Sequence, residues 1–485
     1  MDILSRKKVQ VMTPEKTNIL LFGGGNFVRA FIGSIFQTYN EVLDQNLGIT
    51  VVKVTPGKYI DWIAQDGLYH VNTKGIKNGV LVEETQLISC VREVLSCYDQ
   101  WREFLNTAGN PDIEYIISNT TESGLRYKEE VFSEQRVPDE FPSKLTIWLY
   151  ERFKILGNNS SSGVTLIPCE LLEDNGTLLK NLILQYAELW TIDPAFKNWL
   201  NSACHFCNTL VDRIVPGASQ TSKANTFDAL GYIDNLLTEG EPYHFFAIEA
   251  PEKVQKALPI DKIGLNIIYT NDLAPYRLRK VRMLNGAHSS MVPVGLLGGC
   301  KTVGDVMESK AVENYVQSVI FQEIIPALSL PEEGLQTYAN DILDRFRNPF
   351  IKHQLMSIAL NSFSKFKARI LPSIKDYVAK FGECPDGLCL AYAAMIYLYR
   401  GEINNEKIEL KDDVYVLNSL QHIWSQYGAG AISLEDLNLK IAQDLELWGE
   451  DLSKLPAFLD KTNAFLSKIA NGEIHQVLDD FGLND

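Results

Sequence analysis

The sequence predicts an α/β fold in which a doubly wound parallel sheet is followed by a mostly α-helical region. In the first half, short apolar runs alternate with amphipathic stretches, and a glycine-rich turn joins the first run to the first stretch. After about residue 271, strand-like runs become rare. The 485 residues, 46% of them hydrophobic, suffice for two cores. We therefore expect one domain over residues 1–271 and a second over residues 272–485.

The expected strands of the first domain are short apolar runs bounded by turn-forming residues. They cover residues 18–22, 49–54, 113–118, 164–168 and 265–269. Amphipathic stretches between them predict crossover helices, which include residues 27–39, 143–156 and 176–190. The segment 216–241 is rich in Ser, Gly, Thr and Asn, which predicts an inserted excursion and not a core element.

The second domain is expected to be helical because its apolar residues recur at spacings of three and four. This pattern covers residues 315–328, 354–363, 388–399 and 434–448. Neither a repeat nor a low-complexity tract separates the two halves. The boundary near residue 271 is therefore a change of pattern and not a linker.

Composition argues against several classes of partner. The formal net charge of -16 repels polyanions, and Lys and Arg are spread along the chain, so we expect no nucleic acid. The apolar runs fall short of the roughly 18 residues that a membrane span needs, and the first residues lack the apolar core of a secretory signal. We expect a cytoplasmic protein without membrane association. The sequence does not predict the oligomeric state.

The eight cysteines are scattered without the spacing of a disulfide framework. The candidate zinc ligands are the pairs Cys204 with Cys207 and Cys384 with Cys389. A structural zinc site needs two well-spaced pairs, but the first pair stands in a segment of helical character and the second flanks Pro385. We therefore expect free thiols and no metal.

A glycine-rich turn follows the first expected strand and leads into a helix. This order places backbone N–H groups and the positive end of a helix against a pyrophosphate, as in Rossmann-like dinucleotide-binding domains. Val28 replaces the third glycine of the usual fingerprint, so a plain strand-to-helix turn explains the glycines equally well. If the turn binds a cofactor, its contacts are Gly23, Gly24, Gly25, Asn26, Phe27 and Arg29.

The ends of the next strands give further cofactor candidates. The acidic residue that would bind the adenosine ribose is missing near Thr55, and Lys53 and Lys58 flank that position, so the residues do not choose between NAD and NADP. After the third strand comes a polar cluster, and ligands lie at the carboxyl ends of strands in such sheets. Helix capping is the alternative role for this cluster. The predicted contacts are Asn119, Thr120 and Glu122.

A basic motif around Lys280 stands where strand patterns give way to helical ones. Reducing a ketone requires a proton donor beside the carbonyl oxygen, and a lysine with cationic neighbours can have its pKa lowered into that role. On an ideal α-helix, His288 lies about 12 Å along the axis and about 80° around it from Lys280, and Asn285 lies about 140° around. One ligand would meet them if the lysine reached forward or the ligand were several carbons long. A basic amphipathic helix is the alternative.

The spacing of Lys280, Asn285 and His288, preceded by a Gly-x-Gly-x-Phe-x-Arg-Ala loop, resembles that of the polyol-specific long-chain dehydrogenases, the mannitol dehydrogenase family. The resemblance implies that Lys280 is the general acid/base, that Asn285 and His288 bind the substrate oxygens, and that no catalytic metal is used. A Val-Asp-Arg-Ile motif resembles another family segment and implies that Asp212 lies near the substrate. Leu171 departs from the family, which has an oxyanion-hole asparagine there; Asn175 is the candidate substitute.

The segments 118–122, 168–171, 284–288 and 345–353 look like those of the branch of this family that reduces tagaturonate to altronate with NADH in hexuronate catabolism. The resemblance implies NAD and a small keto acid or aldonate as ligands. A carboxylate substrate needs local positive charge, and the family match points to Lys365, whereas Lys367 and Arg369 are expected to be solvated. The alternatives are a fructuronate reductase or a mannitol or arabinitol dehydrogenase of the same family, and a non-catalytic dinucleotide sensor.

Overall fold

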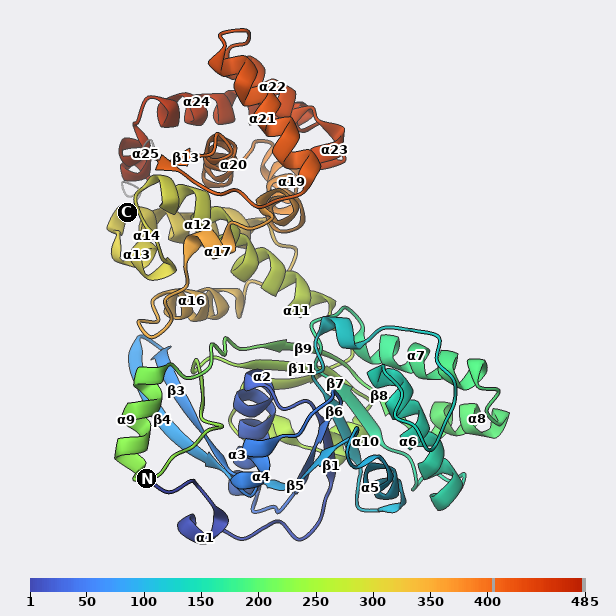
Figure 1. Cartoon of the computed structure of the whole chain (residues 1–485). Coiled ribbons are helices and arrows are strands. Elements are labelled where there is room, and N and C mark those ends of the chain that lie inside the picture. The colour runs from blue at the N-terminus through green and yellow to red at the C-terminus, as the bar shows by residue number, and fades with distance from the viewer. Residues whose placement is uncertain (404–405, 482–485) are drawn as a thin grey trace. The chain divides into compact units, whose positions relative to one another are not determined.

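The computed structural model describes residues 1–403 and 406–481, which form two compact units (Figure 1). The first unit comprises Met1–Gly75 and Leu81–Ala274, and the second comprises Ile76–Val80 and the chain from Pro275 onward. The short segment Ile76–Val80 is the tip of a hairpin, and its Gly79 N–H donates to the Asp344 carboxylate at 3.0 Å. The change of sequence pattern at residue 271 lies close to the junction of the units, but nothing in the sequence indicated that the hairpin tip joins the second unit.

The first unit contains a six-stranded parallel sheet, which confirms the predicted fold class. Its order is β5-β2-β1-β6-β7-β8, so the strand order changes direction between β1 and β6. In doubly wound sheets, ligands bind at the carboxyl ends of the strands at such a point. The strands are β1 Ile19–Phe22, β2 Ile49–Lys53, β5 Val91–Ser96, β6 Tyr115–Ser118, β7 Thr165–Pro168 and β8 His205–Phe206.

The central strands are apolar along their length because helices cover both faces of the sheet. Ile19 and Leu21 of β1 face one core, whereas Leu20 and Phe22 face the other, as the alternation of side chains in a strand requires. The helices of this unit are α1 Arg6–Val9, α2 Asn26–Val28, α3 Ser34–Leu43, α4 Ile60–Ala64, α5 Trp101–Asn106, α6 Phe141–Leu156, α7 Asn175–Leu189, α8 Pro194–Ala203, α9 Gln220–Leu230 and α10 Glu252–Ala257. The expected crossover helices correspond to α2 with α3, to α6 and to α7.

Two three-stranded sheets complete the strands of this half of the chain, in the orders β10-β3-β4 and β12-β11-β9. Their strands are β3 Tyr69–Lys77, β4 Val80–Ile88, β9 Asn208–Asp212, β10 Thr238–Gly240, β11 Phe245–Glu249 and β12 Ile267–Thr270. The strand expected at residues 265–269 therefore exists, but it pairs with β11 outside the large sheet. The Asn78-Gly79 turn between β3 and β4, with positive φ at both residues, is a strong hairpin signal that the sequence analysis missed.

The prediction that residues 216–241 form an excursion is wrong for their second half. Strand β10 is buried and pairs with β3. The preceding Asp234 is fully buried, where it accepts hydrogen bonds from the Gln65 side chain at 2.8 Å and from the His70 backbone at 2.6 Å. Polar composition misled because a polar residue is stable in a core once its hydrogen bonds are satisfied.

The second unit is mostly helical. Its central helix is α20, which is buried along almost its whole length and packs against α12 and α24. The helices are α11 Ala274–Arg279, α12 Gly286–Leu297, α13 Val303–Glu308, α14 Lys310–Ser318, α15 Ile325–Ala327, α16 Leu335–Phe346, α17 Leu355–Ile358, α18 Ser362–Lys365, α19 Leu371–Phe381, α20 Asp386–Leu398, α21 Val414–Gly428, α22 Leu434–Ala442, α23 Leu445–Trp448, α24 Phe458–Ala470 and α25 Ile474–Asp480. Strand β13 Glu402–Ile403 pairs antiparallel with β14 Glu406–Lys407.

Two of the expected helices are interrupted. The stretch 354–363 contains α17 and the start of α18, which are separated at Asn361 with its left-handed φ of 53°. The stretch 434–448 contains α22 and α23, because Asp444 caps the second helix through its side chain. Apolar spacing alone does not show where a cap divides a helix.

Four π-helical turns occur in the described part of the chain: η1 Arg29–Gly33, η5 Lys280–Asn285, η6 Val319–Ile324 and η7 Phe366–Ile370. Such turns are rare and are often found at functional sites. Three of them coincide with candidate residues, since η1 begins at Arg29, η5 begins at Lys280 and η7 follows Lys365.

Candidate active site

The glycine turn after β1 has the conformation of a ligand-binding loop. Gly23 has a φ of 115°, and a Cβ there would lie 2.7 Å from the backbone oxygen of Asn119. A Cβ on Gly24 would lie 2.8 Å from the ring of Tyr59. At Gly25 a Cβ would meet nothing within 4 Å. The first two glycines are thus required by neighbouring parts of the protein, whereas Gly25 borders open space.

The polar side chains after the turn hold it in place. The Arg29 guanidinium donates to the Gly24 backbone oxygen at 2.7 Å and to the Asn26 side chain at 2.6 Å. The Phe27 ring stacks on Phe31 with 4.9 Å between centroids. The side chains of Arg29 and Phe27 therefore help to position this segment. The groups left to contact a ligand are the backbone N–H groups at the start of the helix.

The segment after β6 is held by a buried carboxylate that the sequence analysis did not single out. Glu170, which is 2% exposed, accepts hydrogen bonds from the Ser118 hydroxyl at 3.0 Å and from the Thr120 N–H and hydroxyl at 2.9 and 3.0 Å. Burial raises the pKa of Glu170, and these hydrogen bonds oppose that rise. Asn119 donates to the Cys169 oxygen at 2.7 Å, whereas Glu122 is exposed.

Asn175 serves the interior of the first unit. Its side-chain amide donates to the backbone oxygens of Pro168 and Glu170 and to the Thr209 hydroxyl, each at 3.0 Å. Its oxygen accepts from the N–H groups of Gly176 and Thr209 at 2.9 Å. These hydrogen bonds occupy the amide of Asn175, which argues against it as a substitute for the missing asparagine at position 171, where Leu171 is 60% exposed.

Asp212 is the last residue of β9 and is buried. Its neighbour Arg213 donates to the Glu241 backbone oxygen at 2.9 Å and to the Thr73 hydroxyl at 3.1 Å, and also to the backbone oxygen of Ala30. Burial lowers the pKa of Arg213 to about 10, although Glu241 partly offsets this effect. Arg213 thus ties the end of β9 to η1 and β3, which fixes the backbone that carries Asp212.

Lys280 and Asn285 are the two ends of η5, so the ideal α-helix geometry assumed for the motif is wrong. The Gly286 N–H bonds the Val281 oxygen, five residues earlier, as in a π-turn. In such a turn, residues five apart lie in successive turns near one line along the axis, instead of about 140° apart. Lys280 and Asn285 therefore share a face of the helix, and His288 follows one turn later in α12.

The arginines beside Lys280 have partners within the second unit. Arg282 is buried and pairs with Asp376 at 2.7 Å, and it also donates to the Ser373 hydroxyl at 2.6 Å. The Arg279 guanidinium lies over the Tyr338 ring at 4.2 Å. The charge of Arg282 is therefore compensated by Asp376.

His288 is held as a neutral imidazole with an available nitrogen. Burial lowers its pKa to about 3, and the basic side chains of His353, Arg345, Arg369 and Lys365 add to this effect. The ring stacks on Phe346 and meets His353 edge to face, each at 5.0 Å. Its Nε2 atom is buried and has no hydrogen-bond partner among the residues that the structure describes. A ligand hydroxyl would satisfy that nitrogen.

The neutrality of His288 predicts a pH dependence of stability. The unfolded chain binds a proton below pH 6.5, whereas the folded chain excludes it down to about pH 3, so this residue should weaken the fold as the pH falls through that window. The slope for one group is about 1.4 kcal/mol per pH unit. Urea unfolding at several pH values should show a smaller loss for His288→Gln than for the unmodified protein. Parallel curves for the two proteins would contradict the assignment.

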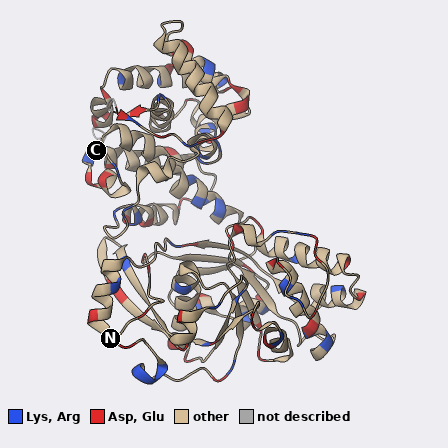
Figure 2. Ribbon diagram, in the orientation of Figure 1, with Lys and Arg blue, Asp and Glu red and all other residues tan. Residues whose placement is uncertain are grey.

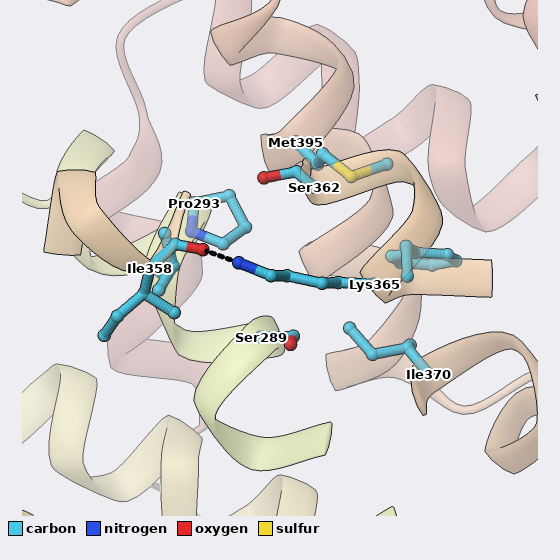
Figure 3. A pocket seen from close by; sticks show the side chains of 9 residues that line it. Ser289, Pro293, Ile358, Ser362, Lys365, Ile370 and Met395 are labelled. Atoms are coloured by element: carbon cyan, nitrogen blue, oxygen red, sulfur yellow. Dashed lines mark hydrogen bonds between the residues drawn. The ribbon is translucent and has the colours of Figure 1, made fainter. Parts of the chain in front are cut away.

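Lys365 lies in the wall of a small cavity that it shares with Ser289, Ile370 and Met395 (Figure 3). The cavity measures about 10 Å³, about one water molecule. The Lys365 Nζ donates to the Ile358 oxygen at 2.8 Å. Burial lowers the pKa of Lys365, Arg369 lowers it further, and Asp412 opposes the change.

The expectation that Arg369 is solvated is wrong. Its guanidinium is partly buried and donates to the Ser289 hydroxyl at 3.2 Å, and burial lowers its pKa. Lys367 is exposed, as expected. The π-turn η7 explains the difference, because it packs against α12 and brings the Arg369 backbone oxygen within 3.3 Å of a Cβ placed on Gly286.

Charges elsewhere are mixed, with basic and acidic residues interspersed over the helices of both units (Figure 2). Lys53 donates to the Thr55 hydroxyl at 2.8 Å and lies over the Tyr59 ring at 4.7 Å. All eight cysteines are free and buried. Within residues 1–403 and 406–481, no group of three or more potential ligands could hold a metal ion. No helix in that part of the chain is long and apolar enough to cross a membrane.

Two family models match the chain in succession. The mannitol dehydrogenase Rossmann domain matches residues 17–262, and the mannitol dehydrogenase C-terminal domain matches residues 272–470. Altronate oxidoreductase of Cronobacter sakazakii is 41% identical over 460 residues, which cover 94% of this chain and 95% of that protein. Altronate oxidoreductase of Bacillus subtilis is 39% identical over 469 residues, which cover 96% and 95%.

Two solved structures resemble the fold, each at 20% sequence identity. Substrate-free D-sorbitol dehydrogenase has a TM-score of 0.77, with 98% of this chain and 100% of that chain covered. Pseudomonas fluorescens mannitol 2-dehydrogenase, in a ternary complex with NAD and D-mannitol, has a TM-score of 0.68, with both chains covered completely.

Proposed function

Because the chain belongs to the mannitol dehydrogenase family, we propose that it is an NAD-dependent oxidoreductase that interconverts tagaturonate and altronate. The curated relatives named altronate oxidoreductase, similar over nearly the whole chain, support this substrate. The observation that supports this chemistry is the position of Lys280 and Asn285 at the two ends of one π-turn, with the unpartnered Nε2 of His288 one turn later. A chain that had become a sensor would have no use for this arrangement.

The glycine loop fits a dinucleotide. The open space at Gly25 leaves room for a pyrophosphate against the backbone N–H groups at the start of the helix, as the sequence predicts. Asn119 and Thr120, held by Cys169 and Glu170, would flank the cofactor at the end of β6. When bound, NAD supplies or accepts the hydride. We propose a domain boundary near residue 271 between the cofactor domain and the catalytic domain.

The residues of the second unit handle the proton. As hydride reaches the keto carbon, its oxygen gains negative charge, and the Lys280 ammonium gives that oxygen a proton, so that ketone, hydride and proton together become the secondary alcohol. The Asn285 amide donates to the same oxygen while the charge develops. The neutral His288 orients a neighbouring hydroxyl through Nε2. In the reverse direction, neutral Lys280 removes the proton. Asp212 is a further substrate contact in this proposal.

We also propose a cytoplasmic location, because a reducing compartment preserves free thiols and all eight cysteines are free. The test of the function is a spectrophotometric assay of NADH oxidation with tagaturonate, fructuronate and fructose. Turnover is expected with tagaturonate, with at most weak rates on the other two. A clear preference for fructuronate or fructose would indicate another substrate specificity within the family. If none of the three compounds is turned over, the result would favour a non-catalytic dinucleotide sensor.

The loop glycines give a paired test of cofactor binding. Gly23→Ala places a side chain on a residue with positive φ and against Asn119, so we expect a loss of stability of about 1–3 kcal/mol. Gly25→Ala meets no protein atom, so its melting temperature should not change. Both variants should bind NADH more weakly in a fluorescence titration. If Gly25→Ala binds NADH as tightly as the unmodified protein, the cofactor does not approach this loop.

A further inference from the structure

Several basic side chains act on the imidazole of His288. The four side chains that act most strongly on its imidazole are His353, Arg345, Arg369 and Lys365. They come from three different segments of the second unit, namely α16, the stretch before α17 and the stretch from α18 to η7. In a chain of net charge -16, a local concentration of positive charge is costly to the free protein. It becomes favourable when an anion binds there.

Arg369 is placed to receive such an anion. Its donor to Ser289 directs the guanidinium toward the residue next to His288, and the packing of η7 on the start of α12 fixes its backbone. A guanidinium presents several N–H donors in a rigid fork that fits a carboxylate with two parallel hydrogen bonds. The hydrogen bond to Ser289 uses one of these donors, which leaves the others for a ligand.

His353 is a second potential hydrogen-bond donor near His288. Its ring meets His288 edge to face at 5.0 Å, and Lys365 is the charged group that acts on it. The ring is partly exposed. A neutral imidazole can give one N–H to an anion. Lys365 is bonded to the Ile358 oxygen and contributes mainly its charge.

We propose that Arg369 and His353, supported by Lys365, bind the carboxylate of the substrate and select keto acids over neutral ketoses. This proposal rests on the proposed function and identifies the residues that make the enzyme selective for its substrate. In tagaturonate, the ketone and the carboxylate stand toward opposite ends of the six-carbon chain. The protein offers a matching order along one helix, with Lys280 and Asn285 at the reacting end, His288 next, and Arg369 at Ser289 beyond it.

The test compares Arg369→Gln and His353→Gln with the control Lys367→Gln, which removes an exposed charge from the same π-turn. Kinetics are measured with tagaturonate and with the neutral ketose tagatose. Arg369→Gln should raise the KM for tagaturonate roughly 10- to 100-fold, with kcat within a few fold and the rate on tagatose unchanged. His353→Gln should raise that KM by a smaller factor. Lys367→Gln should resemble the unmodified enzyme, and Arg369→Lys should restore part of the loss.

Several outcomes would overturn the proposal: an unchanged KM in Arg369→Gln, equal losses on both substrates, or an unmodified enzyme that uses tagatose as well as tagaturonate. Melting temperatures and NADH titrations of each variant separate these results from misfolding. If the enzyme prefers another hexuronate and Arg369→Gln raises the KM for that compound alone, the carboxylate site stands while the substrate assignment fails. If no compound is turned over, stabilisation of the unmodified protein by altronate, lost in Arg369→Gln, supports the site, and no stabilisation overturns it.

Discussion

Replacing Lys280 with alanine is expected to lower kcat by roughly 10²- to 10⁴-fold. The variant retains Asn285 and His288, so substrate is still bound, but the developing alkoxide has no proton donor. The cofactor loop belongs to the other unit, and NADH binding measured by fluorescence should stay within about twofold of the unmodified value. Single-turnover kinetics at saturating tagaturonate would show the loss directly in the hydride step.

Lys301→Ala is the matched control, because Lys301 is an exposed lysine of the same unit. It should leave kcat unchanged. If Lys280→Ala retains kcat within a few fold, or if both variants lose activity equally, Lys280 is not the general acid. A loss of NADH binding in Lys280→Ala would instead indicate that the lysine contributes to the cofactor site.

Replacing Asn285 with alanine should reduce kcat by roughly 10²- to 10³-fold, the usual cost of removing one oxyanion donor. Neither of the other two candidate positions can compensate. Leu171 has no side-chain donor, and the Asn175 amide already donates to Pro168, Glu170 and Thr209. The effect should appear in kcat more than in KM, since the hydrogen bond strengthens as the alkoxide forms.

Asn198→Ala, on the exposed face of α8, is the control for the Asn285 variant and should be neutral in kcat and KM. An Asn285→Ala enzyme with normal kcat and a raised KM would reassign this residue to ground-state binding. A near-normal enzyme on both counts would mean that another donor reaches the oxygen.

Much of the fold could be predicted because the central strands are buried on both faces and therefore read as continuous apolar runs. The hairpin β3–β4 could not be recognised from hydrophobicity, since five of the nine residues of β4 are exposed, the apolar Val80 and Leu81 among them, and only Ile88 is buried. Strand β10 was missed for the opposite reason: its surroundings are polar and yet buried, with Asp234 bonded inside the core. A hydrophobic pattern therefore does not reveal a buried segment whose polar side chains are hydrogen-bonded inside the protein.

The candidate residues could be located in the sequence, but their geometry could not. No residue type between Lys280 and Asn285 distinguishes a π-turn from an α-turn, so the shared face became visible only in three dimensions. Glu170 follows β7, and its three hydrogen bonds depend on the parallel pairing of β6 with β7. Arg369 was expected to be solvated as one of three cations in a short segment, whereas in space it lies against α12 and donates to Ser289.

The π-turn that begins at Lys280 makes the number of residues in the motif as important as their identity. A π-turn holds one residue more than the α-turn it replaces. If the same residues formed a regular α-helix, Lys280 would be rotated by about 100° relative to His288, with every catalytic side chain still present. A regular α-helix would need one residue fewer between Lys280 and His288 to give the same relative orientation, so the spacing of the motif matches a π-turn and not an α-helix.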